Sequence, residues 1–529
     1  MASCSHAQRL GEAALGIDEN LRALNISASR ALAVPGWAEP LVSALQPCLR
    51  PRTSRSKPEL LIGVYGGSMT AGSMNCHTTA HILCAGAHKP VHLAWPAVLQ
   101  RELQPHLPAC HVRVTNRATP ASRATFLLSA GNMRSLVPIG RSADAVVITD
   151  FTVNDNKGLG HLPSREVPAA AMQIAAAMEG LVRFVRGPHP GRSGPPALLQ
   201  VETTRWPFVD GRSVNLSANW ACTPASANVS HGRYDPHYGV ARHYGVPVIS
   251  FLHGAECVRG ERTTLSEYQE ATRRHWRGGC GELDAGTGES VRDCGVHPGP
   301  TTHSILARLI AHHILRHAAA AAAEACGTAL PSSLAADAGP PAANSTLVPE
   351  AQMRRFQGCG PGVNVGLHGT TIDFQTCASG WQRFVASNTG WTCYEDRPGK
   401  PGLIANATGA TIEFKVRATA TASGGDIVIG FLRSYEGMGR VRVGFNGVYS
   451  ESDRTTNTLD GLWESRTSQQ DLAVISATAL AASHLNRTLS GSGHHPSHLR
   501  LGLQLLPASQ TEQPGAAAAK FKVLSIVTC

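Results

Sequence analysis

Hydrophobic positions in the first 325 residues follow two alternating patterns. Short apolar runs, typical of buried strands, occupy 59–65, 111–116, 143–151, 197–203 and 246–251. Longer stretches in which apolar residues recur at helical spacing occupy 94–103, 167–187 and 302–325. Strands that alternate with helices predict an α/β domain, with a parallel sheet covered by helices on both faces.

The pattern changes after a run of alanines that ends at residue 323. Residues 326–350 are rich in Pro, Ala, Ser and Gly, which predicts a linker. Alternating apolar and polar runs, separated by turn residues, then occupy 410–418, 426–434, 440–446, 499–506 and 520–527. This alternation is typical of an antiparallel β sandwich. We therefore predict a lead-in at 1–57, an α/β domain at 58–325 and a smaller all-β sandwich domain at 351–529.

Composition agrees with this division and narrows the range of partners. A chain of 529 residues exceeds one ordinary core, so two domains are expected. The net charge is +10, but the basic residues are scattered and form no dense block, zinc-finger spacing or RNA-binding aromatic motif. We therefore expect no nucleic-acid partner. No stretch approaches the roughly 20 apolar residues of a membrane span, so no transmembrane segment is expected.

Cysteines and glycosylation sequons bear on the cellular compartment. The 14 Cys are an even number and none lies in paired C-x-x-C motifs, which favours disulfides over a zinc site. Six N-x-S/T sequons, which predict a glycoprotein, begin at Asn25, Asn215, Asn228, Asn344, Asn406 and Asn486. Together these features favour the secretory pathway or the extracellular space. The first 24 residues lack the apolar core typical of a signal peptide, so the compartment stays open.

A serine on a glycine-rich turn is the first chemical candidate. The segment GVYGGSMTAG (63–72) begins where a predicted strand ends, which would expose the Ser68 hydroxyl at the carboxyl edge of the sheet. Free backbone N–H groups at such an edge stabilise an oxyanion, so we expect Ser68 to be a nucleophile. The segment lacks the phosphate-loop and dinucleotide patterns, and Thr70 replaces the second Gly of a G-x-S-x-G elbow. A purely structural glycine turn stays an alternative.

Two further segments carry groups that serine chemistry needs. ITDFTVNDN (148–156) offers the Asn154 amide, a neutral donor suited to an oxyanion hole, with helix capping as the alternative role. VRDCGVHPGP (291–300) places Asp293 four residues before His297. A serine hydroxyl needs a base, and the base needs a carboxylate to fix its tautomer, so His297 and Asp293 fit these two roles.

In order and context, the three segments resemble the conserved blocks of SGNH (GDSL-like) hydrolases over residues 58 to about 318. The resemblance implies a flavodoxin-like three-layer sandwich and a catalytic triad of Ser68, His297 and Asp293. The whole chain resembles two-domain SGNH proteins of algal and plant-like genomes. These have a GGS serine block and a β-rich tail with a segment like GFLRSYEGMGRVRV (430–443).

The same resemblance implies an oxyanion hole with three donors. These are the Ser68 N–H, the Asn154 side chain and a backbone N–H from a second block, NRATPASRAT (116–125). This block has no Gly at the expected donor position. The N–H of Ala121, or alternatively of Ser122, is expected to donate, provided that the loop adopts the required backbone angles.

The chain departs from the family pattern at several places. Gly67 replaces the usual Asp before the serine, which removes a buried polar brace, and Thr152 stands where the family has Gly. Asp293 precedes His297 by four positions rather than three. The extra residue would rotate the carboxylate, so Glu289 or a backbone carbonyl is the alternative partner of His297. Loss of the third triad member costs on the order of 10⁴ in turnover, so this spacing bears directly on activity.

The predicted function is that of a serine ester hydrolase, carboxylesterase-like, that cleaves acyl esters through an acyl-enzyme. The expected substrate is a small-molecule or polysaccharide acyl ester, including acyl groups on glycans. A catalytically inactive glycan-binding protein on an SGNH scaffold and a glycan O-acyltransferase are the alternatives. We expect no metal or cofactor, because HHPSH (494–498) is better explained as a solvated loop than as a metal site.

Overall fold

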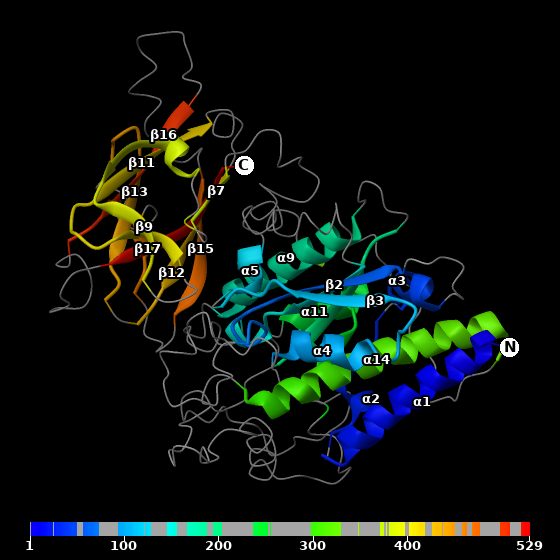
Figure 1. Ribbon diagram of the computed structural model, residues 1–529. Helices are drawn as coiled ribbons and strands as arrows, with labels where there is room; N and C mark the ends of the chain where they lie inside the picture. The colour runs from blue at the N-terminus through cyan, green and yellow to red at the C-terminus, as the bar shows by residue number, and fades with distance from the viewer. Residues whose placement is uncertain are drawn as a thin grey trace. The chain divides into compact units, whose positions relative to one another are not determined.

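The described part of the chain forms two compact units, each with its own hydrophobic core (Figure 1). One unit comprises Met1–Pro120 with Val137–Leu347, and the other comprises Ala121–Leu136 with Val348–Cys529. The computed structural model describes residues 2–24, 26–36, 38–49, 57–72, 94–120, 122–127, 145–155, 167–187, 194–203, 236–251, 254, 298–328, 347–348, 371–374, 377, 380–396, 401–417, 426–435, 437–449, 458–462, 468–476, 498–507 and 520–528. The domain boundaries expected from the sequence stay predictions.

A six-stranded sheet with the order β1-β6-β5-β4-β2-β3 forms the middle of the first unit. Its strands are β1 (Leu32–Val34), β2 (Glu59–Gly66), β3 (His111–Asn116), β4 (Val146–Asp150), β5 (Ala197–Glu202) and β6 (Val248–Ser250). Neighbouring strands are parallel, except that β1 pairs antiparallel with β6 at the edge. The parallel strands follow the flavodoxin-like order 2-1-3-4-5, which confirms the predicted α/β sheet.

Helices cover both faces of this sheet, and Figure 1 shows α1, α4 and α14 on one side with α9 on the other. The longer helices among the described residues of the unit, with the one-turn α2, are α1 (Ala2–Arg22), α2 (Ala28–Ala31), α3 (Glu39–Leu49), α4 (Trp95–Leu103), α9 (Val167–Arg186), α11 (Pro236–Tyr244) and α14 (Pro300–Cys326). The long helix α14 packs against α1, α3 and α4, while α9 packs against α11. Residues of the predicted lead-in therefore contribute to the core of the first unit.

Side chains of β4 point alternately to the two faces of the sheet, so this strand packs against both helical layers. All five of its residues are buried, as expected for a parallel strand between two helical layers. Val146 and Ile148 belong to the core cluster that contains α14. Since successive side chains point to opposite faces, Val147 and Thr149 face the other layer. Asp150, at the carboxyl end of the strand, has the same parity as Val146 and Ile148.

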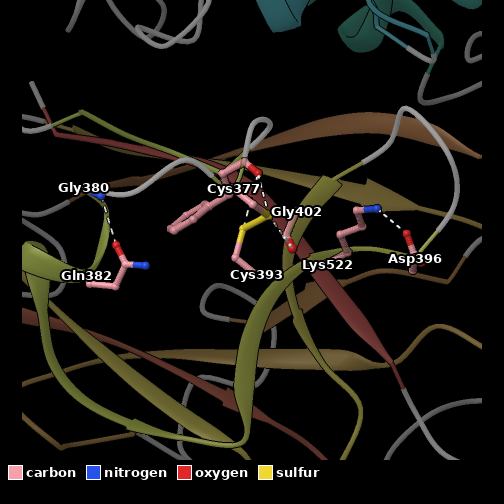
Figure 2. Close-up of a disulfide and its surroundings, with 8 residues drawn as sticks. Cys377, Gly380, Gln382, Cys393, Asp396, Gly402 and Lys522 are labelled. Carbon is pink, nitrogen blue, oxygen red and sulfur yellow. Dashed lines mark hydrogen bonds and ion pairs between the residues drawn. A yellow bond between two sulfur atoms is a disulfide. The ribbon is translucent and has the colours of Figure 1, made fainter. Parts of the chain in front are cut away.

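Three disulfides within the described residues bear out the expected use of cysteine. Cys4–Cys326 joins the first turn of α1 to the last turn of α14, and Cys48–Cys110 joins the end of α3 to the turn before β3. The third, Cys377–Cys393, lies in the second unit, where Figure 2 shows it beside the strand that carries Lys522.

The second unit is an antiparallel β sandwich, as the alternating runs predicted. One sheet has the order β15-β12-β17-β10-β9, with β7 also paired to β17, and the other has the order β14-β13-β16-β11-β8. The strands are β7 (Thr371–Asp373), β8 (Val385–Thr389), β9 (Trp391–Glu395), β10 (Pro401–Ala405), β11 (Thr411–Arg417), β12 (Asp426–Arg433), β13 (Arg440–Phe445), β14 (Thr458–Asp460), β15 (Gln469–Ser476), β16 (His498–Leu505) and β17 (Phe521–Thr528). Phe414 from one sheet and Phe521 from the other lie in the shared core. The unit also includes two short helices, α5 (Ala124–Leu127) and η6 (Gln382–Phe384).

A buried ion pair lies at one end of the first of these sheets. The Lys522 side chain is 1% exposed and its ammonium group binds the Asp396 carboxylate (Figure 2). The same carboxylate also binds Lys520. Gly402 leaves room for it, because a Cβ there would lie 2.6 Å from Lys522 Cε. Burial opposes ionisation of Asp396, but hydrogen bonds from Lys520 and Lys522 outweigh it and hold the Asp396 pKa below its ordinary value.

Candidate active site

The candidate nucleophile lies in a turn directly after β2, at the carboxyl edge of the parallel sheet. Gly66, the last residue of β2, is in register with Asp150, the last residue of β4. The Gly67 N–H donates to the Asp150 carbonyl at 3.2 Å, so the turn begins against the neighbouring strand. Ser68 is partly exposed, whereas Thr70 is fully buried. The turn therefore leaves Ser68 accessible while it anchors the next residues in the interior, as a nucleophile requires.

Glycines at both ends of the turn allow close approach of neighbouring groups. A Cβ at Gly66 would lie 2.4 Å from Thr70 Oγ1 and 2.7 Å from the Asp150 carbonyl oxygen. Gly72 has a φ of 74°, a left-handed conformation that favours glycine. A Cβ at Gly72 would also lie 2.7 Å from the Cβ of Ala94, the residue before α4. The end of the serine turn therefore packs directly against the start of α4.

A buried carboxylate lies beneath the serine turn. The Thr70 Oγ1 donates to Asp150 Oδ2 at 2.7 Å, and the Thr203 Oγ1 lies 2.9 Å from Asp150 Oδ1 and 3.1 Å from Oδ2. Burial raises the pKa of Asp150 to about 6, against the opposing effects of the two threonine hydrogen bonds and of nearby His237. Asp150 is therefore largely ionised at pH 7 and accepts from hydroxyls on both sides.

The second predicted site residue, Asn154, follows β4 in a short helical turn at 152–155. Asn154 is partly exposed, and the next residue, Asp155, is buried with its Oδ2 2.9 Å from His237 Nε2 of α11. The Asp155 N–H also donates to the Phe151 carbonyl at 3.1 Å. Because β2 and β4 are parallel neighbours, Ser68 and Asn154 follow adjacent strands at one sheet edge. Open α/β sheets bind ligands at this edge.

The start of α14 lies next to the start of α4. The helix begins at Pro300, and the preceding Pro298 and Gly299 are buried. One turn into α14, His303 Nδ1 accepts a hydrogen bond from the Trp95 N–H at 3.1 Å. An Nδ1 that accepts carries no proton, so a neutral His303 holds its proton on Nε2. The segment after the predicted base is therefore connected, through the first turn of α4, to the end of the serine turn.

Part of the predicted site is not covered by the structure. Four of its residues lie outside the described part of the chain: Ala121, Glu289, Asp293 and His297. The triad and the second-block oxyanion donor therefore stay predictions. Ser122, the alternative donor, is buried and belongs to the second compact unit. The residues that the structure brings to one sheet edge are Ser68 and Asn154.

Asp235 and His237 stood out in the sequence as residues that could line the cleft, but sequence patterns did not single out Asp150, Thr203 or the pairing of His237 with Asp155. Asp150 closes the apolar run VVITD, Thr203 follows β5, and His237 pairs with Asp155 across 82 positions of sequence. An ionisable residue at the end of a fully buried strand is a signal that would have indicated Asp150. The partners of Asp150 and Asp155 have no such signal, because they come from distant segments that only the sheet brings together.

Among the residues that the structure describes, no group of three or more His, Cys, Asp or Glu side chains is arranged to hold a metal ion. Within the same residues, no helix has both the length and the apolar character needed to span a membrane.

No protein-family model and no curated protein sequence matches the chain. Among solved structures, a two-domain esterase active on acetylated mannans, co-crystallised with mannopentaose, has a TM-score of 0.50 and 16% identity, covering 95% of this chain and 97% of that chain. A second crystal structure described as a two-domain esterase active on acetylated mannans has a TM-score of 0.48 and 16% identity, covering 95% and 98%. At this identity the likeness concerns the fold. The chain therefore has the two-domain fold of such an esterase, a mostly parallel α/β unit with an antiparallel β unit.

Proposed function

We propose that the chain is a carbohydrate esterase that removes acyl groups from a polysaccharide through a serine nucleophile. The observation that carries the proposal is the position of Ser68, partly exposed on a turn after β2, with Asn154 after the adjacent parallel strand. The fold shared with an esterase active on acetylated mannans supports ester hydrolysis and a glycan substrate. SGNH membership of this chain is part of the proposal and rests on the sequence resemblance.

The proposed reaction has two halves. Ser68 Oγ attacks the ester carbonyl while His297 accepts its proton, and Asp293 holds the imidazole in the tautomer that this requires. The Ser68 N–H, the Asn154 amide and the N–H of Ala121 stabilise the oxyanion. The sugar hydroxyl leaves with the proton from His297, and an acyl ester of Ser68 remains. Water, activated by His297, then hydrolyses this ester and releases the carboxylic acid.

The neighbourhood of α14 supports His297 as the base. Pro298, which follows His297 directly, is buried, and His303 contacts the start of α4 through the Trp95 N–H. The start of α4 in turn packs against Gly72 at the end of the serine turn. A histidine at the head of this helix is therefore a reasonable source of the imidazole that Ser68 needs.

Acetate release from acetylated mannan by the purified chain tests the proposal, with Ser68→Ala as the matched variant. We expect release by the wild type, its loss in Ser68→Ala, and covalent labelling of Ser68 by a fluorophosphonate probe. Labelling that is undiminished in Ser68→Ala, or an active wild type that is never labelled, would contradict a serine mechanism.

The same assay separates the two alternatives. Mannan binding without acetate release would favour a catalytically inactive glycan-binding protein, which the departures at Gly67 and Thr152 and the Asp293–His297 spacing already suggest. Transfer of the acetyl group to an added acceptor glycan, without release to water, would favour an O-acyltransferase.

A further inference from the structure

The carboxylate of Asp150 is buried, and its hydrogen-bond donors are hydroxyl and backbone N–H groups, with the His237 imidazole nearby. The residue is 3% exposed, and its side chain accepts hydrogen bonds from the hydroxyls of Thr70 and Thr203 and from the Thr203 backbone N–H. Burial of an ionised carboxylate is costly unless it accepts strong hydrogen bonds. An ionised carboxylate accepts from both threonines at once, whereas a protonated one has to donate through one of its oxygens. When Asp150 is ionised, the Thr70 hydroxyl therefore has to donate to it.

Thr70 is the interior anchor of the serine turn. Its hydroxyl binds Asp150 of β4, and its carbonyl accepts the Asn116 Nδ2 of β3 at 2.8 Å. The strands β4 and β3 flank β2 on its two sides, so Thr70 ties the turn to both neighbours. On the other side of Ser68, the Gly67 N–H donates to the Asp150 carbonyl. Ser68 therefore lies between two attachments to the same residue, one through the Asp150 main chain and one through its side chain.

We propose that Asp150 is a positioning residue that holds the Ser68 turn, through Thr70, in the geometry for attack on the ester. This inference rests on the proposed function, in which Ser68 is the nucleophile. Asp150 is buried beneath the turn, and the proposed mechanism does not place it in contact with the substrate. Its replacement is therefore expected to affect the reactivity of Ser68 rather than substrate binding. Misplacement of a reacting group by about 1 Å costs up to about 100-fold in rate. For Asp150→Asn and Thr70→Val we therefore expect kcat to fall by about 10- to 100-fold, with KM unchanged.

The test compares Asp150→Asn and Thr70→Val with Thr70→Ser, which keeps the hydroxyl, and with Thr149→Val as the matched control. Thr149 precedes Asp150 on the same strand, is buried, faces the other helical layer, and its hydroxyl has no hydrogen-bond partner among the described residues. A fluorophosphonate probe gives two readings for each protein: the final labelled fraction counts correctly folded sites, and the labelling rate reports the reactivity of Ser68. Hydrolysis of p-nitrophenyl acetate per labelled site gives kcat and KM.

Asp150→Asn and Thr70→Val are expected to reach the wild-type labelled fraction at a slower rate, whereas Thr70→Ser and Thr149→Val react like the wild type. A merely structural role predicts a lower labelled fraction with an unchanged rate per site, and that result would overturn the inference. Wild-type rates in both Asp150→Asn and Thr70→Val would overturn it too, while the proposed function would stand. A wild type that is never labelled would overturn both. Should Asp150→Asn fail to fold, the comparison of Thr70→Val with Thr70→Ser decides.

Discussion

Replacement of Asp150 by Asn is expected to change how the stability of the protein depends on pH. The pKa of Asp150 rises from its ordinary value of 3.8 to about 6, mainly through burial. Each pKa unit corresponds to about 1.4 kcal/mol, so ionisation of Asp150 costs about 3 kcal/mol more in the folded protein than in the unfolded chain. Because the pKa of Asp150 is higher in the folded protein, protonated Asp150 stabilises the fold relative to its ionised form. This stabilisation is fully present below pH 4. It is lost as the pH rises through 6.

An Asn at this position stays neutral throughout the range, so the contribution disappears. Any constant loss from altered hydrogen bonding to Thr70 and Thr203 shifts the whole curve without changing its slope. As the pH rises, the free energy of unfolding of Asp150→Asn is therefore expected to increase relative to that of the wild type. The movement between pH 4 and pH 7 is expected to be up to about 3 kcal/mol.

Urea unfolding of both proteins at several pH values between 4 and 7 measures this difference directly. The other titratable groups are common to the two proteins, so their contributions cancel in the comparison, apart from the electrostatic interaction of Asp150 with His237, which the substitution removes. Thr149→Val serves as the control for a buried change at the adjacent position, and its curve is expected to run parallel to that of the wild type. A curve for Asp150→Asn that also runs parallel to the wild type would refute the assignment of a raised pKa to Asp150.

Three further outcomes are expected. Asp396→Asn leaves the ammonium of Lys522 buried without its ionised partner, and is expected to destabilise the second unit by about 3–5 kcal/mol. The double variant Asp396→Asn, Lys522→Met is expected to recover this stability, and thermal unfolding measures both effects. Loss of the Cys4–Cys326 bond, which closes a sequence separation of 322 residues, is expected to cost about 2–4 kcal/mol, measured by unfolding of the Cys4→Ser, Cys326→Ser variant. Burial, with nearby charges, lowers the pKa of His317 to about 4, so its contribution to stability is present above pH 6.5 and is lost as the pH falls towards 4. His317→Gln is expected to flatten this acid limb, and an unchanged limb in urea unfolding at pH 4 to 6.5 would contradict it.

Much of the fold could be predicted because hydrophobic spacing records which faces of an element are buried. The run at 410–418 alternates residue by residue, and β11 forms at Thr411–Arg417 with Ile412, Phe414 and Val416 in the core. The helical spacing at 302–325 likewise corresponds to α14. Local sequence also indicated the Ser68 turn, because glycines directly after a strand permit the positive-φ and closely packed backbone that a tight turn needs.

The polar groups that surround that turn depend on pairings between distant segments. Asp150 meets Thr70 and Thr203 only because β2, β4 and β5 are adjacent in the sheet. His237 and Asp155 meet for the same kind of reason, across 82 positions of the chain. A local pattern shows that a polar side chain will be buried, but strand order determines which residue forms its hydrogen bond.

The sequence by itself thus determined the class of each unit, the positions of the parallel strands and of helices α4, α9 and α14, and the serine turn with its neighbouring Asn154. Tertiary structure alone decided the antiparallel edge strand β1, the pairing of the cysteines and the buried carboxylate beneath Ser68. The physical reason is that periodicity reflects burial, which each segment carries in its own residues. Hydrogen bonds and disulfides join two segments, and their geometry exists only after the chain has folded.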